Sequence, residues 1–365
     1  MLLAAASMSK ARSRYQGLTG QLAWMSDVAV NEWKEIPGSS FNNLAVSMGA
    51  PNGSGTMPGD KIDAWCGLVA AGTKIYTPWN GGHDNYWGNE VDVVDIGVSI
   101  PAPVRLENSS ATGDVTFSSA AYSDGRPPSC HSYTSLHYNA TDQRIIRVGA
   151  PAISKSGAQR NECASFSTVT NQTEAAGTVP DVPGSINETA PASWRDVNDN
   201  LYIIVSYNIY KYTRASNTWN GTAVASTLDQ PGFQCCAALD TLRNRVLITG
   251  GANAQDKPWL FTPPSTTQAV TFGGSEPTIL HSIGAGIVYC ADIDRYVARL
   301  HTAGGAAYTV HPTTFAVEPL VTTGGASIPA SVLGSIYSRI LPMPSLNGLV
   351  YLPRYSSNFW FLRTS

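Results

Sequence analysis

The sequence predicts an all-β chain folded as a single six-bladed β-propeller, whose ring is closed by an N-terminal strand pairing with the C-terminal blade. Charged residues make up only 13% of the 365 residues, about half the roughly 25% typical of soluble proteins, which disfavours long solvent-facing helices. Gly (33) and Pro (23) are abundant, as expected for a chain with many turns. A repeated pattern of strands then specifies the kind of β fold.

The repeat has the same layout in each unit. An apolar strand follows a turn that bears Asp or Asn, and a loop leads from it to a strand rich in aromatic and β-branched residues. Successive units are about 45–70 residues apart, which is the spacing of propeller blades. The apolar strands are KIYTPWNGG (74–82), RIIRVGA (144–150), NLYIIVSY (200–207), NRVLITGGA (244–252), DRYVARLHT (294–302) and NGLVYLPRY (347–355).

The segment before each of these strands is predicted to be the innermost strand of its blade, because its small residues suit the crowded axis of a ring. The Gly-Gly pairs at 81–82 and 250–251 are predicted to be structural, since glycine lets a backbone approach a neighbour closely. The six predicted inner strands are 64–71, 132–138, 191–197, 235–240, 284–290 and 334–341.

The two ends of the sequence predict how the ring closes. The sixth unit stops at Ser365, directly after its third strand, and NEWKEIPG (31–38) has the character of a missing outer strand. We therefore expect residues 21–365 to form the propeller and residues 1–20 to form an N-terminal arm. In the arm, apolar residues precede the basic ones, the reverse of a secretory signal. A two-sheet sandwich with irregular repeats is the alternative fold.

Two segments, NGGHDNYWGNEVDVVDI (80–96) and DGRPPSCHSY (124–133), resemble the kelch and galactose-oxidase-like propeller family, which has bacterial and bacteriophage members. The resemblance covers most of residues 30–365 and implies a propeller of kelch type. In galactose oxidase, copper is held by two tyrosines and two histidines, one tyrosine directly preceding a histidine. None of the six histidines here follows a tyrosine, so we predict no copper centre. We also predict no other cofactor or metal, because the sequence has no P-loop or dinucleotide-binding motif and its paired acids lack the glycine and glutamate of a calcium loop.

Polar residues in two loops are the candidate ligand-binding set. Four of them follow the first Gly-Gly pair and two lie at the entry to the second blade, where propeller loops surround the central channel. Hydrogen bonding between blades is the alternative role, and no catalytic residue is predicted. The candidates are His83, Asp84, Asn89, Glu90, Arg126 and His131.

Other classes of protein fit the sequence poorly. The net charge is −3 with no basic block, which argues against nucleic-acid binding, and no stretch approaches the roughly 20 apolar residues of a membrane span. The six cysteines form no CxxC pair and are predicted to be buried free thiols. Acids in ADIDRY (291–296) and DVNDN (196–200) are predicted to cap turns.

These observations favour a non-enzymatic structural or interaction protein. The prediction is a bacteriophage virion component of the tail, neck or host-attachment apparatus, with other subunits as partners through the N-terminal arm and a host surface glycan as a further candidate partner. The alternative is a secreted or periplasmic bacterial protein, either carbohydrate-binding or a galactose-oxidase-like enzyme, in which exposed tryptophans stack on sugar rings.

Overall fold

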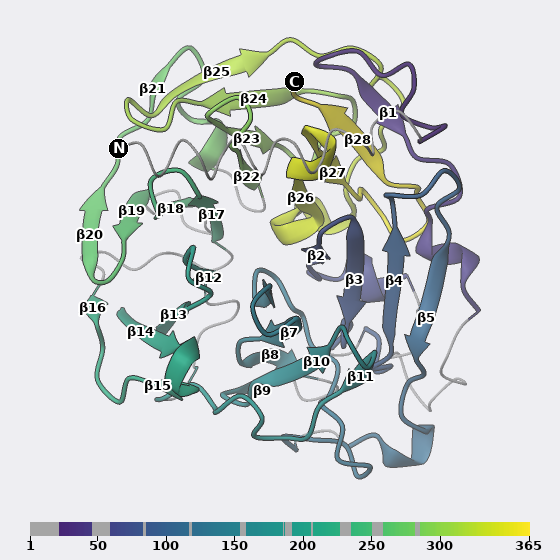
Figure 1. Ribbon diagram of the computed structural model, residues 1–365, viewed down its shortest axis with the longest axis vertical. Helices are drawn as coiled ribbons and strands as arrows, with labels where there is room; N and C mark the ends of the chain where they lie inside the picture. The colour runs from purple at the N-terminus through teal and green to yellow at the C-terminus, as the bar shows by residue number, and fades with distance from the viewer. Residues whose placement is uncertain are drawn as a thin grey trace.

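Six β-sheets are arranged in a ring, so the predicted all-β six-bladed propeller is confirmed (Figure 1). The protein is seen in a computed structural model. The structure describes residues 22–45, 59–82, 85–116, 119–153, 158–184, 186, 192–205, 207–226, 235–249, 258–281 and 285–365.

Each blade is an antiparallel sheet whose first four strands follow one another outward from the ring axis. From the innermost strand, blade 1 is β2 (Val69–Ala71), β3 (Lys74–Pro78), β4 (Val91–Asp95) and β5 (Pro103–Glu107); blade 2 is β6 (Leu136–Asn139), β7 (Arg144–Arg147), β10 (Ala164–Ser167) and β11 (Gln172–Thr173); blade 3 is β12 (Ser193–Arg195), β13 (Leu201–Val205), β14 (Asn208–Thr213) and β15 (Thr218–Trp219); blade 4 is β17 (Cys236–Asp240), β18 (Arg245–Thr249), β19 (Trp259–Thr262) and β20 (Thr266–Ala269); blade 5 is β22 (Gly286–Cys290), β23 (Arg295–Arg299), β24 (Ala307–Val310) and β25 (Ala316–Leu320); blade 6 is β26 (Ile340–Met343), β27 (Gly348–Tyr351), β28 (Trp360–Arg363) and β1 (Trp33–Glu35).

Short strands and helices lie outside the four main strands of each blade. The remaining strands are β8 (Ala150–Ile153) and β9 (Ala158–Arg160), which form a hairpin, β16 (Ala225–Ser226) beside β14, and β21 (Gly273–Gly274) beside β25. The helices are α2 (Asp60–Asp63) and the 3-10 turns η1 (Phe41–Asn43), η2 (Thr112–Asp114), η3 (Arg214–Ser216), η4 (Ile279–His281), η5 (Val332–Gly334), η6 (Tyr337–Arg339) and η7 (Pro344–Leu346).

The turn between the first two strands of every blade uses the same backbone device. One residue near the start of the second strand has a positive φ, between 48° and 65°. Asn, Asp and Gly tolerate this left-handed region best, which explains the Asp and Asn residues of the sequence repeat. The residues are Gly72, Gln143, Asp199, Asn244, Asp294 and Asn347.

Hydrophobic clusters fill the six spaces between neighbouring blades. Adjacent residues of a middle strand face opposite neighbours: Ile145 of β7 packs toward blade 1, whereas Ile146 packs toward blade 3. Because side chains alternate across a sheet, a strand buried on both faces needs a continuous apolar run. This requirement explains the apolar middle strands from which the blades were predicted.

The ring closes as predicted. Strand β1 pairs antiparallel with β28, with Trp33 opposite Leu362 and Glu35 opposite Trp360, and so becomes the outer strand of blade 6. The Trp33 side chain is 1% exposed, and its indole nitrogen donates a hydrogen bond to the Gly305 oxygen at 2.8 Å. The N-terminal segment thus joins the C-terminal blade. The predicted arm lies outside the described residues.

The backbone geometry explains the first Gly-Gly pair. Gly81 and Gly82 have φ of 139° and 75°, and a Cβ on Gly82 would lie 2.5 Å from the Ala152 oxygen and 2.6 Å from the Cys130 Cα. We expect Gly82→Val to lower the free energy of unfolding by about 1–3 kcal/mol through backbone strain and these clashes. Gly113→Val is the control, because a Cβ there meets nothing within 4 Å. Equal urea midpoints for the two variants would contradict this account. The second pair, 250–251, lies outside the described residues.

Candidate functional site

Of the six predicted ligand-binding residues, His83 and Asp84 lie outside the described residues, and the other four make hydrogen bonds within the ring. The Asn89 amide donates to Ser110 Oγ and to the Pro127 oxygen, both at 2.9 Å. Arg126 donates to the Asn108 oxygen at 2.6 Å and to the Asn89 oxygen at 3.2 Å. These contacts tie two loops of blade 1 together. A ligand-binding role for Asn89 and Arg126 remains a prediction.

Glu90 belongs to a buried charged group at the seam between blades 1 and 6. Its Oε1 accepts hydrogen bonds from Lys61 Nζ at 3.3 Å and from the Tyr86 hydroxyl at 2.7 Å. Lys61 also pairs with Asp92, and Arg105 Nε donates to Asp92 Oδ1 at 2.8 Å. We call Lys61, Tyr86, Glu90, Asp92 and Arg105 the seam cluster. It holds two cations and two carboxylates, and Lys61, Glu90 and Asp92 are at most 2% exposed.

Electrostatics favour the cationic form of Lys61 and the neutral form of Tyr86 in the seam cluster. Burial alone would lower the pKa of Lys61, but the adjacent Glu90 and Asp92 carboxylates outweigh burial and raise it. Burial, reinforced by Glu90, also raises the pKa of Tyr86. Lys61 therefore stays cationic and Tyr86 stays a hydrogen-bond donor near neutral pH. The predicted binding role of Glu90 also remains untested, although its contacts suit a structural part.

His131 lies in a chain of hydrogen bonds at the ring axis. Its Nε2 lies 3.0 Å from Asn85 Oδ1, and its Nδ1 lies 3.3 Å from the Tyr133 hydroxyl. The Asn85 amide in turn donates to Asp60 Oδ2 at 3.4 Å. An Asn oxygen only accepts, so this network assigns the His131 proton to Nε2. The chain links a carboxylate on α2 to a tyrosine at the entry of blade 2.

Aromatic side chains surround this chain. The Trp65 ring lies 5.0 Å from the His131 ring, and Tyr133 lies 5.1 Å from Tyr337, measured between ring centroids. Trp65, Tyr133 and Tyr337 pack with Cys236 and with other residues of blades 4 and 5, so they meet across the axis. We call Asp60, Trp65, Asn85, His131, Tyr133 and Tyr337 the axial cluster.

Three of the predicted inner strands begin later in the sequence than predicted, each after an aromatic residue of the axial cluster. Trp65, Tyr133 and Tyr337 have φ of 54°, 42° and 48°, so the chain turns at each of them and the strands begin later, at Val69, Leu136 and Ile340. Bulky residues in the left-handed region are unusual and concentrate at functional sites. Aromatic residues therefore fill space at the axis where small ones were predicted.

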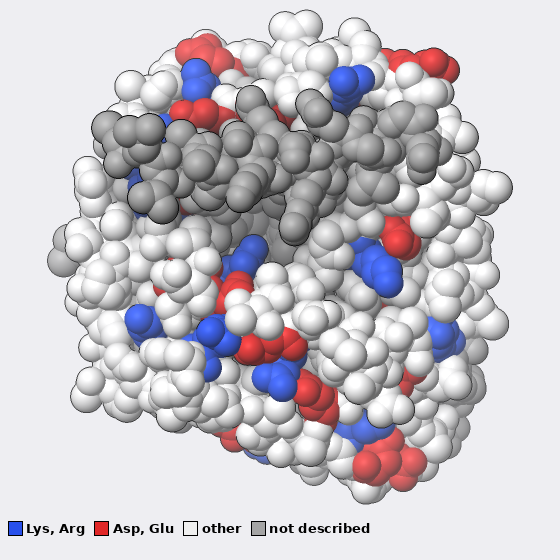
Figure 2. Space-filling model, viewed as in Figure 1, with Lys and Arg blue, Asp and Glu red and all other residues white. Residues whose placement is uncertain are grey.

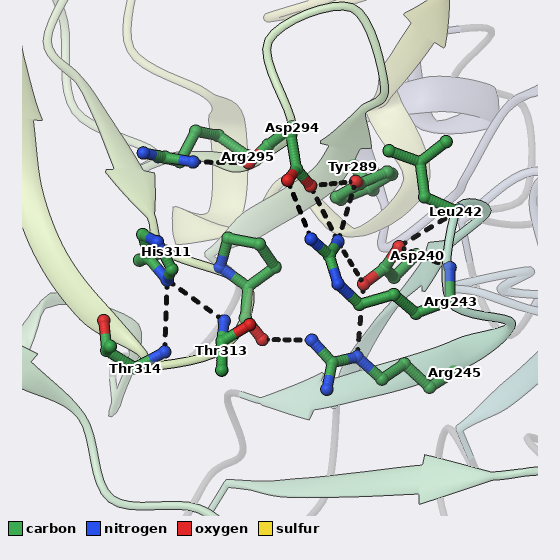
Figure 3. Close-up of polar contacts among 11 residues, drawn as sticks. Asp240, Leu242, Arg243, Arg245, Tyr289, Asp294, Arg295, His311, Thr313 and Thr314 are labelled. Atoms are coloured by element: carbon green, nitrogen blue, oxygen red, sulfur yellow. Dashed lines mark hydrogen bonds and ion pairs between the residues drawn. The ribbon is translucent and has the colours of Figure 1, made fainter.

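A second polar network joins blades 4 and 5 (Figure 3). Arg243 donates two hydrogen bonds of 2.7 Å to the Asp294 carboxylate. It also donates to Tyr289 Oη and to Asp240, both at 3.2 Å. The Arg243 hydrogen bonds lower the pKa of Asp294 to about 2. Arg245 also donates to Asp240 at 3.2 Å. The charged side chains of this network therefore bond to one another and connect the first turn of blade 4 to that of blade 5.

Turn capping, predicted for two acidic segments, is confirmed for one of them. In ADIDRY, Asp294 instead pairs with Arg243, and Asp292 accepts a hydrogen bond from the Thr364 hydroxyl at 2.6 Å. In DVNDN, Asp196 Oδ1 accepts from the backbone nitrogens of Asn198 at 2.9 Å and Asn200 at 3.0 Å, which confirms turn capping.

Around the ring, acidic and basic side chains lie next to one another on an otherwise largely uncharged face (Figure 2).

All six cysteines are buried and free, as predicted. Burial raises the pKa of Cys66, Cys163 and Cys236 to about 12, so these thiols are protonated at neutral pH and are poor nucleophiles. Across the described residues, no group of three or more His, Cys, Asp and Glu side chains is arranged to hold a metal ion. No helix in the described ranges is long and apolar enough to cross a membrane.

One histidine outside the predicted set is strongly perturbed. His137 Nε2 lies 2.8 Å from Ser193 Oγ, between the inner strands of blades 2 and 3, and burial, aided by Arg195, lowers the pKa of His137 from 6.5 to about 3. Between these two values the unfolded chain binds the extra proton, so stability should fall as pH drops from 6.5 toward 3, by up to about 1.4 kcal/mol per pH unit.

Urea midpoints between pH 7 and pH 4.5 measure this effect. We expect His137→Gln to flatten the acid-side fall relative to the parent protein. Ser193→Ala, which removes the hydrogen-bond partner and leaves the imidazole buried, should keep the fall. Parallel curves for the parent and His137→Gln would contradict the assignment.

Comparison with known proteins adds no family name. No family model matches the chain, and no curated protein matches it. The protein is thus defined by its architecture, an all-β six-bladed propeller with a polar and aromatic cluster at its axis.

Proposed function

We propose that the protein is a non-enzymatic interaction protein, a bacteriophage virion component of the tail, neck or host-attachment apparatus, built on a propeller of kelch type. The architecture of the ring supports this proposal. A closed ring with filled spaces between its blades is a rigid platform, and platforms of this kind present broad faces to partners. The kelch assignment rests on the resemblance of residues 80–96 and 124–133.

The axial cluster is the observation that carries the proposal. Its half-buried members Asp60, Trp65 and Asn85 offer a carboxylate, an indole and an amide. Asn85 is hydrogen-bonded to both Asp60 and His131, and the Trp65 ring packs against the His131 ring, so these contacts fix their relative positions. Preorganised polar and aromatic side chains of this kind suit recognition, because little conformational entropy is lost on binding. The nearby Cys66 thiol, with a pKa of about 12, supplies no reactive nucleophile.

Mass spectrometry of purified phage particles from the native source tests the proposal. We expect the protein at a fixed copy number per particle, retained through gradient purification, with a non-structural protein of the same genome as the negative control. Absence from particles would overturn the proposal.

Copper loading separates the proposal from the oxidase alternative. We expect no stoichiometric copper and no hydrogen peroxide from galactose or related alcohols. A radical absorption band after copper loading would instead favour the galactose-oxidase-like enzyme.

A further inference from the structure

The chain contains four Asn-Gly pairs, at residues 52–53, 80–81, 220–221 and 347–348. An asparagine followed by glycine can lose its side-chain amide without an enzyme, and asparagine is one of the thermolabile residues of proteins. The pair at 52–53 lies outside the described residues. The structure places the other three in very different surroundings.

The reaction joins two neighbouring groups of the pair. The backbone nitrogen of the glycine attacks the side-chain carbonyl carbon of the asparagine, a cyclic imide forms, and the side-chain nitrogen leaves as ammonia with the proton of the backbone amide. Water then opens the imide at either carbonyl and gives aspartate or isoaspartate. Glycine favours the attack because it has no Cβ and its backbone turns freely. Ring closure needs a near-attack geometry, so a pair that is fixed in another geometry reacts slowly.

The Asn80-Gly81 pair is fixed by hydrogen bonds. Asn80 is 1% exposed, and its side-chain amide donates to the Gly67 oxygen at 2.7 Å. Its side-chain oxygen accepts from Ser132 Oγ at 2.6 Å, and the Gly81 nitrogen donates to the Cys130 oxygen at 3.1 Å. Both reacting groups are therefore bound to other partners.

The Asn347-Gly348 pair is fixed by the sheet of blade 6, although Asn347 itself is exposed. Gly348 begins β27 and is paired with Met343 on one side and Arg363 on the other. The Asn347 oxygen also accepts a hydrogen bond from the Thr364 nitrogen at 2.9 Å. The Gly348 nitrogen reaches the Asn347 side chain only if these contacts break.

The Asn220-Gly221 pair is open at both reacting groups. Both residues are exposed and lie in the loop between β15 and β16. Among the described residues, neither the Asn220 side chain nor the Gly221 nitrogen has a hydrogen-bond partner, whereas the Asn220 nitrogen donates to the Lys211 oxygen at 2.8 Å. A Cβ on Gly221 would meet nothing within 4 Å, so the backbone has room to turn.

We propose that Asn220 is a site of spontaneous deamidation, in which the Gly221 nitrogen displaces the side-chain amide. The product places a new negative charge beside β15, the outer strand of blade 3, in a chain whose formal net charge is −3. Isoaspartate also lengthens the main chain, but it does so in a loop and not in a strand. The protein therefore carries a chemical marker of its age. This inference goes beyond the proposed virion role and does not depend on it.

Peptide mapping by mass spectrometry of the folded full-length protein, incubated at pH 8 and 37 °C, tests the site. We expect aspartate and isoaspartate to form at position 220 about tenfold or more faster than at Asn80 and Asn347, because the fold withholds the attack geometry from those two. In urea, where the fold is lost, the three rates should converge. A rate at Asn220 no higher than at Asn80 in the folded protein would overturn the proposal.

Two matched substitutions identify the attacking atom. Gly221→Val places a branched side chain beside the attacking nitrogen and should slow deamidation of Asn220 about tenfold or more. The melting temperature should not change, because the added side chain enters open space. Gly113→Val makes the same change at another open glycine and should leave the rate at Asn220 at the parent value. Equal rates at Asn220 in the two variants would overturn attack by the backbone nitrogen in favour of direct hydrolysis.

Discussion

Removing residues 1–40 is expected to abolish cooperative folding at 37 °C or to lower the melting temperature sharply. The deletion removes strand β1 and exposes an edge of blade 6. It also removes buried side chains from the clusters on both sides of that blade. These side chains are Leu22, Trp24, Met25, Val28, Trp33 and Ile36. At about 2–4 kcal/mol for each large apolar side chain, the loss is comparable with the whole stability of a typical domain.

Removal of residues 1–21 is the matched control. It leaves every described residue in place, including Trp24, whose indole nitrogen donates to the Ile96 and Val98 oxygens at 3.2 Å. We expect its melting temperature to match that of the full chain. If calorimetry finds the same melting temperature for all three proteins, strand β1 does not close the ring in solution.

The blade pattern could be predicted because it depends on local chemistry. Middle strands need continuous apolar runs, and the turns before them need residues that tolerate positive φ, such as Asn244 and Asn347. Closure could be predicted from a missing strand at one end of the sequence and a candidate at the other. All three signals are visible without knowledge of distant contacts.

The starts of three inner strands could not be predicted in the same way. Trp65, Tyr133 and Tyr337 have high strand propensity, yet all three adopt the left-handed region. Their side chains contact residues of blades 4 and 5, which are remote in sequence. Tertiary packing across the axis therefore overrides local preference, and a propensity argument has no access to that packing.

The candidate site could be predicted only in part for the same reason. His131 was found because it lies in a polar loop beside a blade. Asp60 and Trp65 were missed, since their proximity to His131 depends on how the loops before blades 1 and 2 meet. Glu90 was selected for its loop position, yet its partner Lys61 is 29 residues away in the sequence and gives it a structural setting.

Lys61→Met is expected to cost about 3–5 kcal/mol of unfolding free energy, the usual result of leaving buried charges without their partner. The substitution leaves Glu90 and Asp92 in the seam with Arg105 as their remaining cation. Lys74→Met is the control, because Lys74 is exposed on β3 and should change stability by about 0.5 kcal/mol or less. Equal urea midpoints for the two variants would show that the seam cluster does not stabilise the ring.

A double variant then separates charge from packing. Lys61→Met combined with Glu90→Gln removes one carboxylate together with the ammonium group and leaves Asp92 paired with Arg105 at 2.8 Å, so these side chains keep no unpaired charge. We expect it to recover at least half of the lost stability, because the penalty lies in uncompensated charge and not in lost contacts. Lys61 has a raised pKa, so its contribution is complete below its unfolded value of 10.5 and is lost only as pH rises through the higher folded value. The difference between the parent and Lys61→Met should therefore persist across the neutral range and shrink only in strong alkali.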